Sequence, residues 1–232
     1  MNQIQEYINI VCTECKVKSK AFTKLTEAQL NLVDQHRTEL TFRKGELLCK
    51  QGMFMSHIIY IRKGFVKLYL DNDDEVTILT IVKPGSFIGV QALYGEDIFP
   101  FSAEALTDTE VCLKDVNIFR QLVLENAEFA KEIIKVLNKN LLDAYNRMYS
   151  LTQKQINGRF AELLLFLSNT LYEANPFQLT ISRKDMADLI STSPESVSRL
   201  MTEFREQGLI KTKGHLVEIL DDLRLDTICK CG

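Results

Sequence analysis

Three features that would assign the 232-residue sequence to a protein class are missing. There is no run of about eighteen apolar residues, so we expect no membrane-spanning helix and no membrane partner. The start, MNQIQEYINIVCTEC, lacks the basic and apolar regions of a secretory signal peptide, so the expected location is the cytoplasm. The net charge is −3, which is not the basic surplus typical of nucleic-acid-binding proteins. Only local patterns can therefore indicate DNA binding.

Histidine is scarce, and its distribution bears on enzyme function. The three histidines, His36, His57 and His215, lie in separate segments. A metal-dependent enzyme on a jelly-roll scaffold would need clustered histidines and a carboxylate as ligands. The sequence shows no such cluster, so an enzyme is only an alternative and we expect no catalytic residues.

Six cysteines occur, at positions 12, 15, 49, 112, 229 and 231. In a cytoplasmic protein we expect reduced thiols rather than disulfides. Cys49 and Cys112 lie in apolar segments and are expected in the core. Cys12 and Cys15, like the C-terminal Cys-x-Cys, have a spacing closer to that of metal sites, but each pair is only half of a zinc site. A redox pair formed by Cys12 and Cys15 is a further alternative.

Residues 40–115 predict a β-rich domain. Short runs with alternating apolar residues recur there between glycines, as in LTFRKGELLCKQG, HIIYIRKGFVKLYL, VTILTIVKPGSFIG and SAEALTDTEVCLKD. Many short strands at this spacing are typical of a sandwich, barrel or jelly roll. Residues 26–37, before these strands, predict a short amphipathic helix.

Residues 126–151 predict a long helix with a seam for dimerisation. Apolar residues recur in it at alternating spacings of three and four, the a/d pattern of a coiled coil, from Ala127 and Ala130 onward. We expect a parallel dimer through Ile134, Leu137, Leu141, Ala144, Met148 and Leu151. In the alternative, the helix packs on its own domain and faces the sheet with Ile133, Leu142, Tyr145 and Tyr149.

A second domain is expected to begin near residues 150–153. Residues 153–172 predict a helix with one apolar face, and residues 177–181 predict a short strand. The proline at the Asn175-Pro176 step separates the two elements, because proline disfavours helix in the residue before it.

Two short helices joined by a tight turn are predicted next. Ser182 and Asp185 have the spacing of a capping box at the start of the first helix. Ser193 followed by Pro194 favours the start of a second helix over residues 194–207, because serine is a good N-cap and proline a good first helical residue.

A hairpin around Lys213-Gly214 follows and completes the pattern of a winged helix-turn-helix. In that motif the second helix enters the major groove of DNA. Its exposed face would carry Glu195, Ser198 and Arg199, whose acid, hydroxyl and guanidinium groups can contact base edges. Phosphate contacts are expected from four basic residues that flank this helix or lie on the wing, Arg183, Lys184, Lys211 and Lys213. The alternative is a helical hairpin with a solvated polar face.

With these motifs the sequence resembles the Crp/Fnr family of bacterial transcription regulators over nearly its full length. The matching stretches are IYIRKGFVKLYL, the PGSFIG turn, the heptad helix and DMADLISTSPESVSRLMTEFREQGLI. The resemblance implies an α+β fold with three parts. They are a sensor domain over residues 1–125, a dimerisation helix over 126–152 and a winged helix-turn-helix domain over 153–232. The sensor domain would be a double-stranded β-helix, or jelly roll, of the cyclic-nucleotide-binding type.

The resemblance also implies the partners. A homodimer would bind double-stranded DNA and act together with RNA polymerase. The pattern Glu195-x-x-Ser198-Arg199 is similar to the Fnr branch, and this implies a palindrome of TTGA-like half-sites.

By the same resemblance, the effector pocket lies in the roll at Phe87, Gly89, Val90, Gln91, Phe101, Ser102 and Ala103. Members that bind cyclic AMP carry a glutamate just after the FIG turn and an Arg-Ser/Thr-Ala triplet for the phosphate. Here those positions read Val90-Gln91 and Phe101-Ser102-Ala103. Without the arginine, the cyclic phosphate loses its charge-assisted partner, so we expect an effector other than cyclic AMP. The aromatic side chains in this region either favour an apolar or planar ligand or simply fill the pocket; they are Tyr94, Phe99 and Phe101.

Oxygen sensors of the Fnr branch hold a four-iron iron–sulfur cluster on four cysteines. Cys12 and Cys15 match the first pair, and Cys112 matches the last ligand. The third position is Ala21, so a cluster that needs four thiolates is one ligand short. An iron–sulfur cluster, a haem and plain reduced thiols stay open, and no metal site is predicted. The function predicted is a DNA-binding regulator with a small effector. Its alternatives are a regulatory module without DNA activity and a redox or iron–sulfur variant of the same family.

Overall fold

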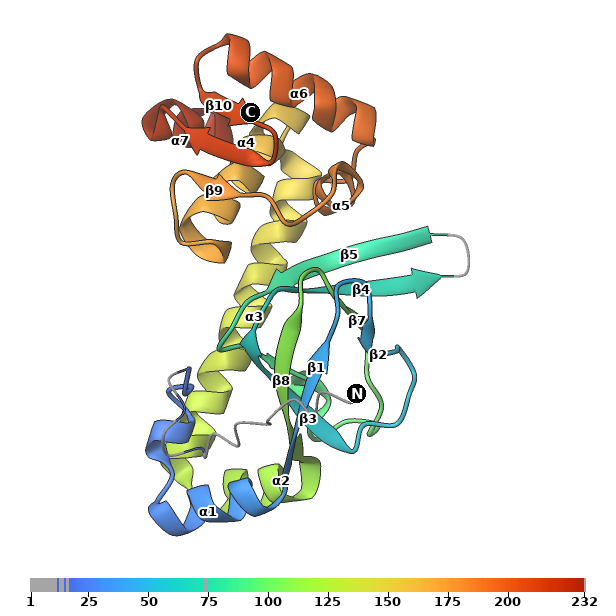
Figure 1. The fold of residues 1–232 in the computed structure, drawn as a ribbon, viewed down its shortest axis with the longest axis vertical. Coiled ribbons are helices and arrows are strands. Elements are labelled where there is room, and N and C mark those ends of the chain that lie inside the picture. Colours follow the sequence, from blue (N-terminus) through green and yellow to red (C-terminus); the bar gives the residue numbers. More distant parts are fainter. Residues whose placement is uncertain (1–11, 13–14, 16, 73–74, 232) are drawn as a thin grey trace, which may run out of the picture.

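The computed structural model describes residues 12, 15, 17–72 and 75–231. It consists of a β-rich N-terminal domain, one long helix and a C-terminal domain of helices with a small sheet (Figure 1). The predicted α+β fold, a roll followed by a long helix and a winged helix-turn-helix, is confirmed. Among the described residues, no helix is both long enough and apolar enough to cross a membrane.

The N-terminal domain is a roll made of two four-stranded antiparallel sheets. One sheet has the strand order β1-β8-β3-β6, with bounds Arg37–Phe42, Thr109–Asp115, His57–Lys63 and Phe87–Ile88. The other has the order β2-β7-β4-β5, with bounds Leu47–Cys49, Ser102–Ala105, Val66–Asn72 and Glu75–Val82. Because alternate side chains of a strand point to one face, the apolar alternation in the sequence fills the interior of the roll.

Short helices flank the strands of the roll. They are η1 (Phe22–Lys24), α1 (Glu27–Gln35), η2 (Val90–Ala92) and α2 (Val116–Glu125). Of these, α1 and α2 lie together at the end away from the C-terminal domain (Figure 1). An aromatic cluster joins η1 to the strands and to the helix that begins at Ala127: the ring of Phe22 is 6.0 Å from Tyr60, 5.6 Å from Phe87 and 5.9 Å from Phe129 between centroids. Cys49 and Cys112 are buried in this core, as predicted.

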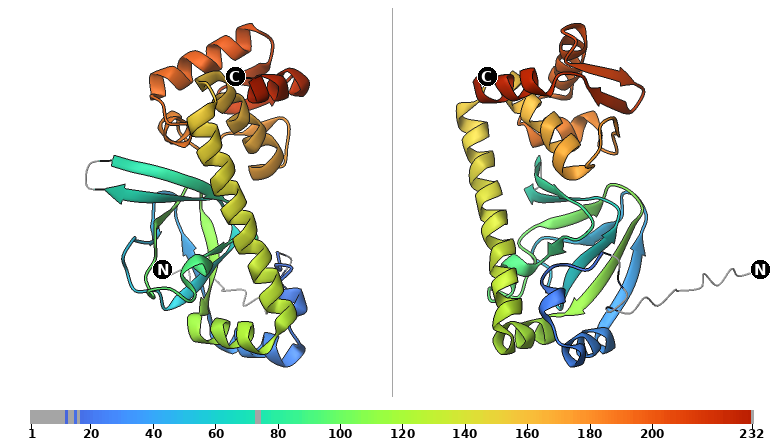
Figure 2. Two further views of the ribbon diagram at one scale, coloured as in Figure 1. Left: turned by 180° about the vertical axis from the view of Figure 1, so that it is seen from behind. Right: turned by 90° about the vertical axis from the view of Figure 1, so that its left-hand side faces the viewer.

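The long helix α3 (Ala127–Gln153) runs along one side of the roll up to the C-terminal domain (Figure 2). Asn126 caps its first turn by accepting a hydrogen bond from the backbone N–H of Phe129 at 3.0 Å. Phe129 and Ile133 are buried against the roll. Arg147, further along the same side, donates to the carbonyl oxygen of Leu79 on β5.

The other side of α3 is an exposed apolar face. Its side chains are 50–62% exposed and are Ile134, Leu141, Leu142, Tyr145, Met148 and Tyr149. Of the remaining predicted seam residues, Ala144 is exposed, whereas Leu137 and Leu151 are half-buried. The alternative packing is wrong for three of its four residues, since only Ile133 faces the roll and the other three belong to the exposed face.

The C-terminal domain begins with α4 (Ile156–Phe166), which continues into a π-helical turn, η3 (Leu167–Leu171). Its other elements are β9 (Phe177–Gln178), α5 (Arg183–Leu189), α6 (Pro194–Glu206), β10 (Ile210–Lys213), β11 (Leu216–Ile219) and α7 (Asp222–Cys231). The strands form a sheet with the order β10-β11-β9. Lys154 has an extended backbone, so α3 and α4 are separate helices, and the predicted strand over 177–181 is shorter than expected.

Candidate DNA-reading helix and sensor sites

The helix-turn-helix is built by local capping interactions. At the start of α5, Ser182 Oγ accepts from the backbone N–H of Asp185 at 3.0 Å, and Asp185 Oδ2 accepts from the N–H of Ser182 at 2.8 Å. This is the predicted capping box. The turn that follows passes through Ser191, which has a φ of +51° at a position where glycine is common. Ser193 then caps α6 by accepting from the N–H of Ser196 at 3.2 Å, and Pro194 is the first helical residue.

Helix α6 has a buried face and an exposed face. Its apolar residues pack into the domain core and are Val197, Leu200, Met201 and Phe204. The three predicted base-reading residues, Glu195, Ser198 and Arg199, are all exposed on its N-terminal turns. The structure thus brings an acid, a hydroxyl and a guanidinium together on the part of the helix that a winged helix-turn-helix presents to bases.

Two of these side chains have defined local partners. Ser198 donates its hydroxyl hydrogen to the carbonyl oxygen of Pro194 at 2.9 Å, which leaves the lone pairs of the oxygen facing outward. Hydrogen bonds from its own backbone N–H and from the Ser193 hydroxyl lower the pKa of Glu195. Glu195 is therefore an anion near neutral pH and can only accept hydrogen bonds.

The four predicted phosphate contacts differ in exposure. Lys184, Lys211 and Lys213 are exposed, and Lys211 lies 4.0 Å from Glu218 on the neighbouring strand of the wing. Arg183 is half-buried, burial lowers its pKa, and its guanidinium contacts Met186 Sδ at 3.4 Å. Arg183 would have to leave this position to reach a phosphate fully, so the three lysines are the stronger candidates.

The residues expected to form an effector pocket lie in the roll. All of them except Gln91 have buried side chains or backbone, and Gln91 is exposed. Gly89 adopts a φ of +99°, and a Cβ there would be 2.9 Å from Met55 Sδ, so the core packs tightly against this turn. Phe99 and Phe101 are buried, whereas Tyr94 is 61% exposed. Phe99 and Phe101 thus fill this part of the roll, as one of the two interpretations expects, whereas Tyr94 does not.

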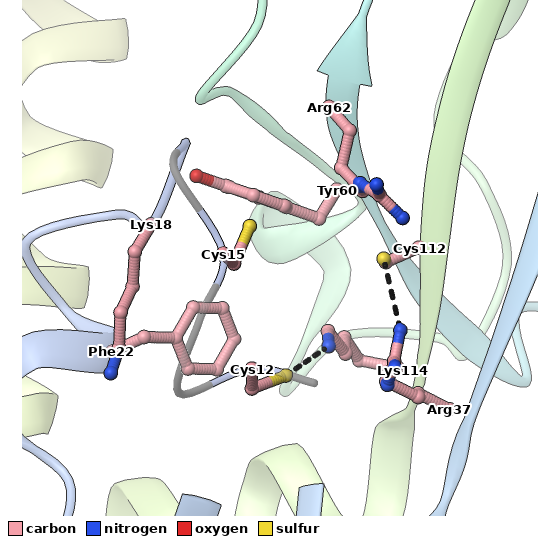
Figure 3. Close-up of a pocket in the computed structure, with 9 residues that line it drawn as sticks. All are labelled: Cys12, Cys15, Lys18, Phe22, Arg37, Tyr60, Arg62, Cys112 and Lys114. Atoms are coloured by element: carbon pink, nitrogen blue, oxygen red, sulfur yellow. Dashed lines mark hydrogen bonds between the residues drawn. The ribbon is translucent and has the colours of Figure 1, made fainter. Parts of the chain in front are cut away.

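Three cysteines line one small cavity together with basic side chains (Figure 3). The cavity volume is about 20 Å³, and its lining residues are Cys12, Cys15, Lys18, Phe22, Arg37, Tyr60, Arg62, Cys112 and Lys114. The buried Lys114 Nζ donates to Cys12 Sγ at 3.0 Å, and Arg37 donates to Cys112 Sγ at 3.9 Å. Cys12 and Cys15 are far from Cys112 in the sequence, and the structure brings all three to one cavity, as the resemblance to the Fnr branch implies.

This cavity does not fit a four-iron cluster. A space of about 20 Å³ holds a water molecule, not a cubane. Ala21, at the position of the missing ligand, is 2% exposed and belongs to the apolar core. Within the described part of the chain, no three metal-ligating side chains are grouped as a metal ion would require. We therefore derive no iron–sulfur chemistry from these residues.

Comparison with known proteins agrees with this architecture. Residues 39–126 match the cyclic nucleotide-binding domain, and residues 158–228 match the Crp-like helix-turn-helix domain. The transcriptional activator protein Anr of Pseudomonas protegens is 29% identical over 188 residues, which cover 79% of this chain and 77% of Anr. Electron transport regulator A of Shewanella oneidensis is 25% identical over 228 residues, covering 94% of this chain and 90% of the relative.

A solved structure shares the fold as well. FixK2 from Bradyrhizobium japonicum superposes with a TM-score of 0.77 at 24% identity, covering 83% of this chain and 96% of FixK2. A cyclic-nucleotide-binding-type roll that leads through one long helix to a Crp-like helix-turn-helix defines a two-domain, DNA-binding transcription regulator. The chain belongs to the Crp/Fnr family.

Proposed function

We propose that this regulator binds, as a homodimer, a DNA palindrome with TTGA-like half-sites. The observation that carries the proposal is the exposed N-terminal part of α6, where Glu195, Ser198 and Arg199 lie on one face. In the sequence, this E-x-x-S-R pattern is the one that resembles the Fnr branch.

Each of the three side chains has a partner in the half-site. The guanidinium of Arg199 can form two hydrogen bonds with O6 and N7 of guanine. The anionic Glu195 can accept from N4 of the complementary cytosine. Ser198, whose hydroxyl hydrogen is bound to Pro194, offers only lone pairs and its methylene group, which suits contact with a thymine.

The exposed lysines supply the part of the affinity that does not depend on sequence. Lys184 precedes the turn, and Lys211 and Lys213 lie on the wing, so they can approach phosphates on both sides of the reading helix. Phosphate contacts fix the register of the protein on DNA without selecting a base.

The exposed face of α3 supports the homodimer. Six large apolar side chains at least half-exposed on one helix leave a surface that an isolated chain would expose to water. Three of them, Ile134, Leu141 and Met148, recur every seven residues, which is the period of a coiled-coil seam. A dimer through this face would place two reading helices on the two halves of a palindrome. We propose RNA polymerase as a further partner of the dimer bound to DNA.

A small effector other than cyclic AMP completes the proposal. Phe101 stands where cyclic-AMP-binding members carry the phosphate-binding arginine, and its ring is buried. An uncharged buried ring cannot compensate a cyclic phosphate.

In vitro selection from random DNA tests the proposal with wild type and two variants. Arg199→Ala should weaken binding to the preferred site by about 1–3 kcal/mol and relax selection at the guanine, while Lys213→Ala should weaken all sequences alike and reduce the salt dependence. An unchanged base preference in Arg199→Ala would show that α6 does not read the site. A wild type that selects no sequence would favour a regulatory module without DNA activity.

A further inference from the structure

The roll and the DNA-binding domain share an apolar interface. Ile78 and Ile81 on β5, together with Leu106, are buried in the same core cluster as the residues of the C-terminal domain. The ring of Phe65 packs edge-on against Tyr172 with 5.2 Å between centroids. The hairpin of β4 and β5 lies directly below α5, the first helix of the helix-turn-helix (Figure 1).

Among the described residues, two ion pairs join the roll to the C-terminal domain in this region. Lys83 pairs with Glu173, whose side chain is 66% exposed, and Lys67 forms the less exposed pair with Asp185. Lys67 on β4 has its Nζ 3.0 Å from Glu104 Oε1 on β7 and 3.6 Å from Asp185 Oδ1 on α5. The side chains of Lys67 and Asp185 are only 16% and 13% exposed. Burial opposes the charge of Lys67, but the hydrogen bond with Glu104 and the charge of Asp185 outweigh it and raise the pKa of the lysine.

Asp185 divides its two oxygens between the domains. Oδ2 accepts from the backbone N–H and the hydroxyl of Ser182, at 2.8 and 2.6 Å, and so caps α5. Oδ1 is the oxygen closest to Lys67. A single carboxylate therefore fixes the start of α5 and also ties that start to the roll.

The same lysine connects α5 to the strand of the expected effector pocket. In the register of the sheet, Lys67 is opposite Glu104, and Leu68 is opposite Ala103. Glu104 directly follows Ser102 and Ala103, two of the residues expected in the pocket. A displacement of this strand would move Glu104 relative to Lys67, and with it the lysine that holds Asp185.

We propose that the Lys67–Asp185 pair is a positioning contact through which the roll holds the helix-turn-helix in a DNA-accessible orientation. The proposal rests on the DNA binding proposed above. The apolar part of the interface is not directional, whereas an ion pair with a hydrogen-bonded carboxylate fixes one relative placement. The roll contacts α5 at Asp185, and the reading face of α6 and Lys184 stay exposed. Losing the pair therefore lowers DNA affinity without removing any group that touches DNA.

Two substitutions, each of which removes one of the two opposite charges of the pair, test this contact. Lys67→Met removes the ammonium and keeps the length of the side chain. Asp185→Asn keeps a carbonyl oxygen for the cap at Ser182 and removes the charge that faces Lys67. Lys63→Met is the matched control, because Lys63 pairs with Glu110 at 3.2 Å within the roll and is 69% exposed.

DNA affinity is measured by fluorescence anisotropy on the selected palindrome at one salt concentration. We expect Lys67→Met and Asp185→Asn each to weaken binding about fivefold, the double variant to bind no more weakly than either single one, and Lys63→Met to bind like wild type. General electrostatics predicts otherwise, because loss of a lysine weakens and loss of an aspartate strengthens attraction to phosphates. Opposite effects of the two single variants, additive effects in the double one, or an equal effect of the control would overturn the proposal.

A measurement without DNA separates this proposal from the proposed function. Amide hydrogen exchange of α5 should become faster in Lys67→Met and stay unchanged in Lys63→Met, because the start of α5 loses its tie to β4. Unchanged exchange in Lys67→Met would refute the contact even if the protein binds DNA. Faster exchange in a protein that selects no DNA would instead show that the proposed function is wrong.

Discussion

Charging the exposed face of α3 should dissociate the proposed homodimer. The variant is Leu141→Lys with Met148→Lys, two side chains that are 50% and 62% exposed and one heptad apart. Leu137 is unsuitable, because it is half-buried against the roll of its own chain and a lysine there would damage the fold.

The size of the effect follows from the area left exposed. Burying a whole side chain of this size contributes about 1.5–3 kcal/mol, so the exposed parts of Leu141 and Met148 contribute about 1 kcal/mol each. Both copies lose both contacts, which makes about 4 kcal/mol, or about a thousandfold in the dimer Kd. The four lysines brought together at the seam add repulsion and desolvation to this loss.

Sedimentation velocity over about 0.1–100 µM protein measures the association, since this range spans the expected change in Kd. Wild type should sediment as a dimer and the variant as a monomer with the same thermal stability of the roll. Asp143→Lys is the control, because Asp143 is exposed on α3 outside the apolar face. A variant that stays dimeric, or a wild type that is monomeric throughout, would refute the assignment of this face.

Two further predictions concern the stability of each domain. Phe204→Ala should lower the free energy of unfolding of the C-terminal domain by about 3–5 kcal/mol in urea titrations, because the ring is 1% exposed and packs at 5.0 Å against Phe160. The control is Thr202→Ala at an exposed position, which should change this free energy by less than about 0.5 kcal/mol. Equal effects of the two variants would contradict the packing of Phe204. Burial raises the pKa of the Cys49 thiol from 9.0 to about 12. The folded roll holds this proton more tightly than the unfolded chain, so the stability is fully present below pH 9 and is lost as the pH rises toward 12. Stability measured against pH should fall less over this range in Cys49→Ala, and an unchanged slope would count against the burial of the thiol.

The helix-turn-helix could be predicted from the sequence because its boundaries depend on neighbouring residues. Ser182 with Asp185, and Ser193 with Pro194, satisfy the free N–H groups at the helix starts through contacts that span three residues. Such contacts can be predicted from the spacing of residue types along the sequence. The exception is Ser191, which has a positive φ although it is not a glycine, so the sequence gives no sign of this backbone conformation.

The orientation of α3 shows where the sequence stops being informative. Apolar residues occur on more than one side of this helix, and a heptad period does not state which side the roll covers. Ile133 and Phe129 turned out to pack on the roll, while Leu142 and Tyr145 are exposed, because the aromatic cluster of the roll lies against the first turns of the helix. That cluster is assembled from distant segments and has no local signature.

Contacts between the two domains could not be predicted from the sequence either. These contacts limit how strongly a ligand in the roll can change the affinity for DNA. Lys67 and Asp185 are far apart in the chain, and no spacing rule relates them. A ligand in the roll can change DNA affinity only by as much as its own affinity differs between the two placements of the helix-turn-helix. The fivefold change expected for the ion pair corresponds to about 1 kcal/mol, so a ligand that binds about fivefold better to one placement would match the effect of the pair. Because Glu104 and Asp185 both pair with Lys67, a displacement of the strand that carries Ser102 and Glu104 would change the balance between the two pairs.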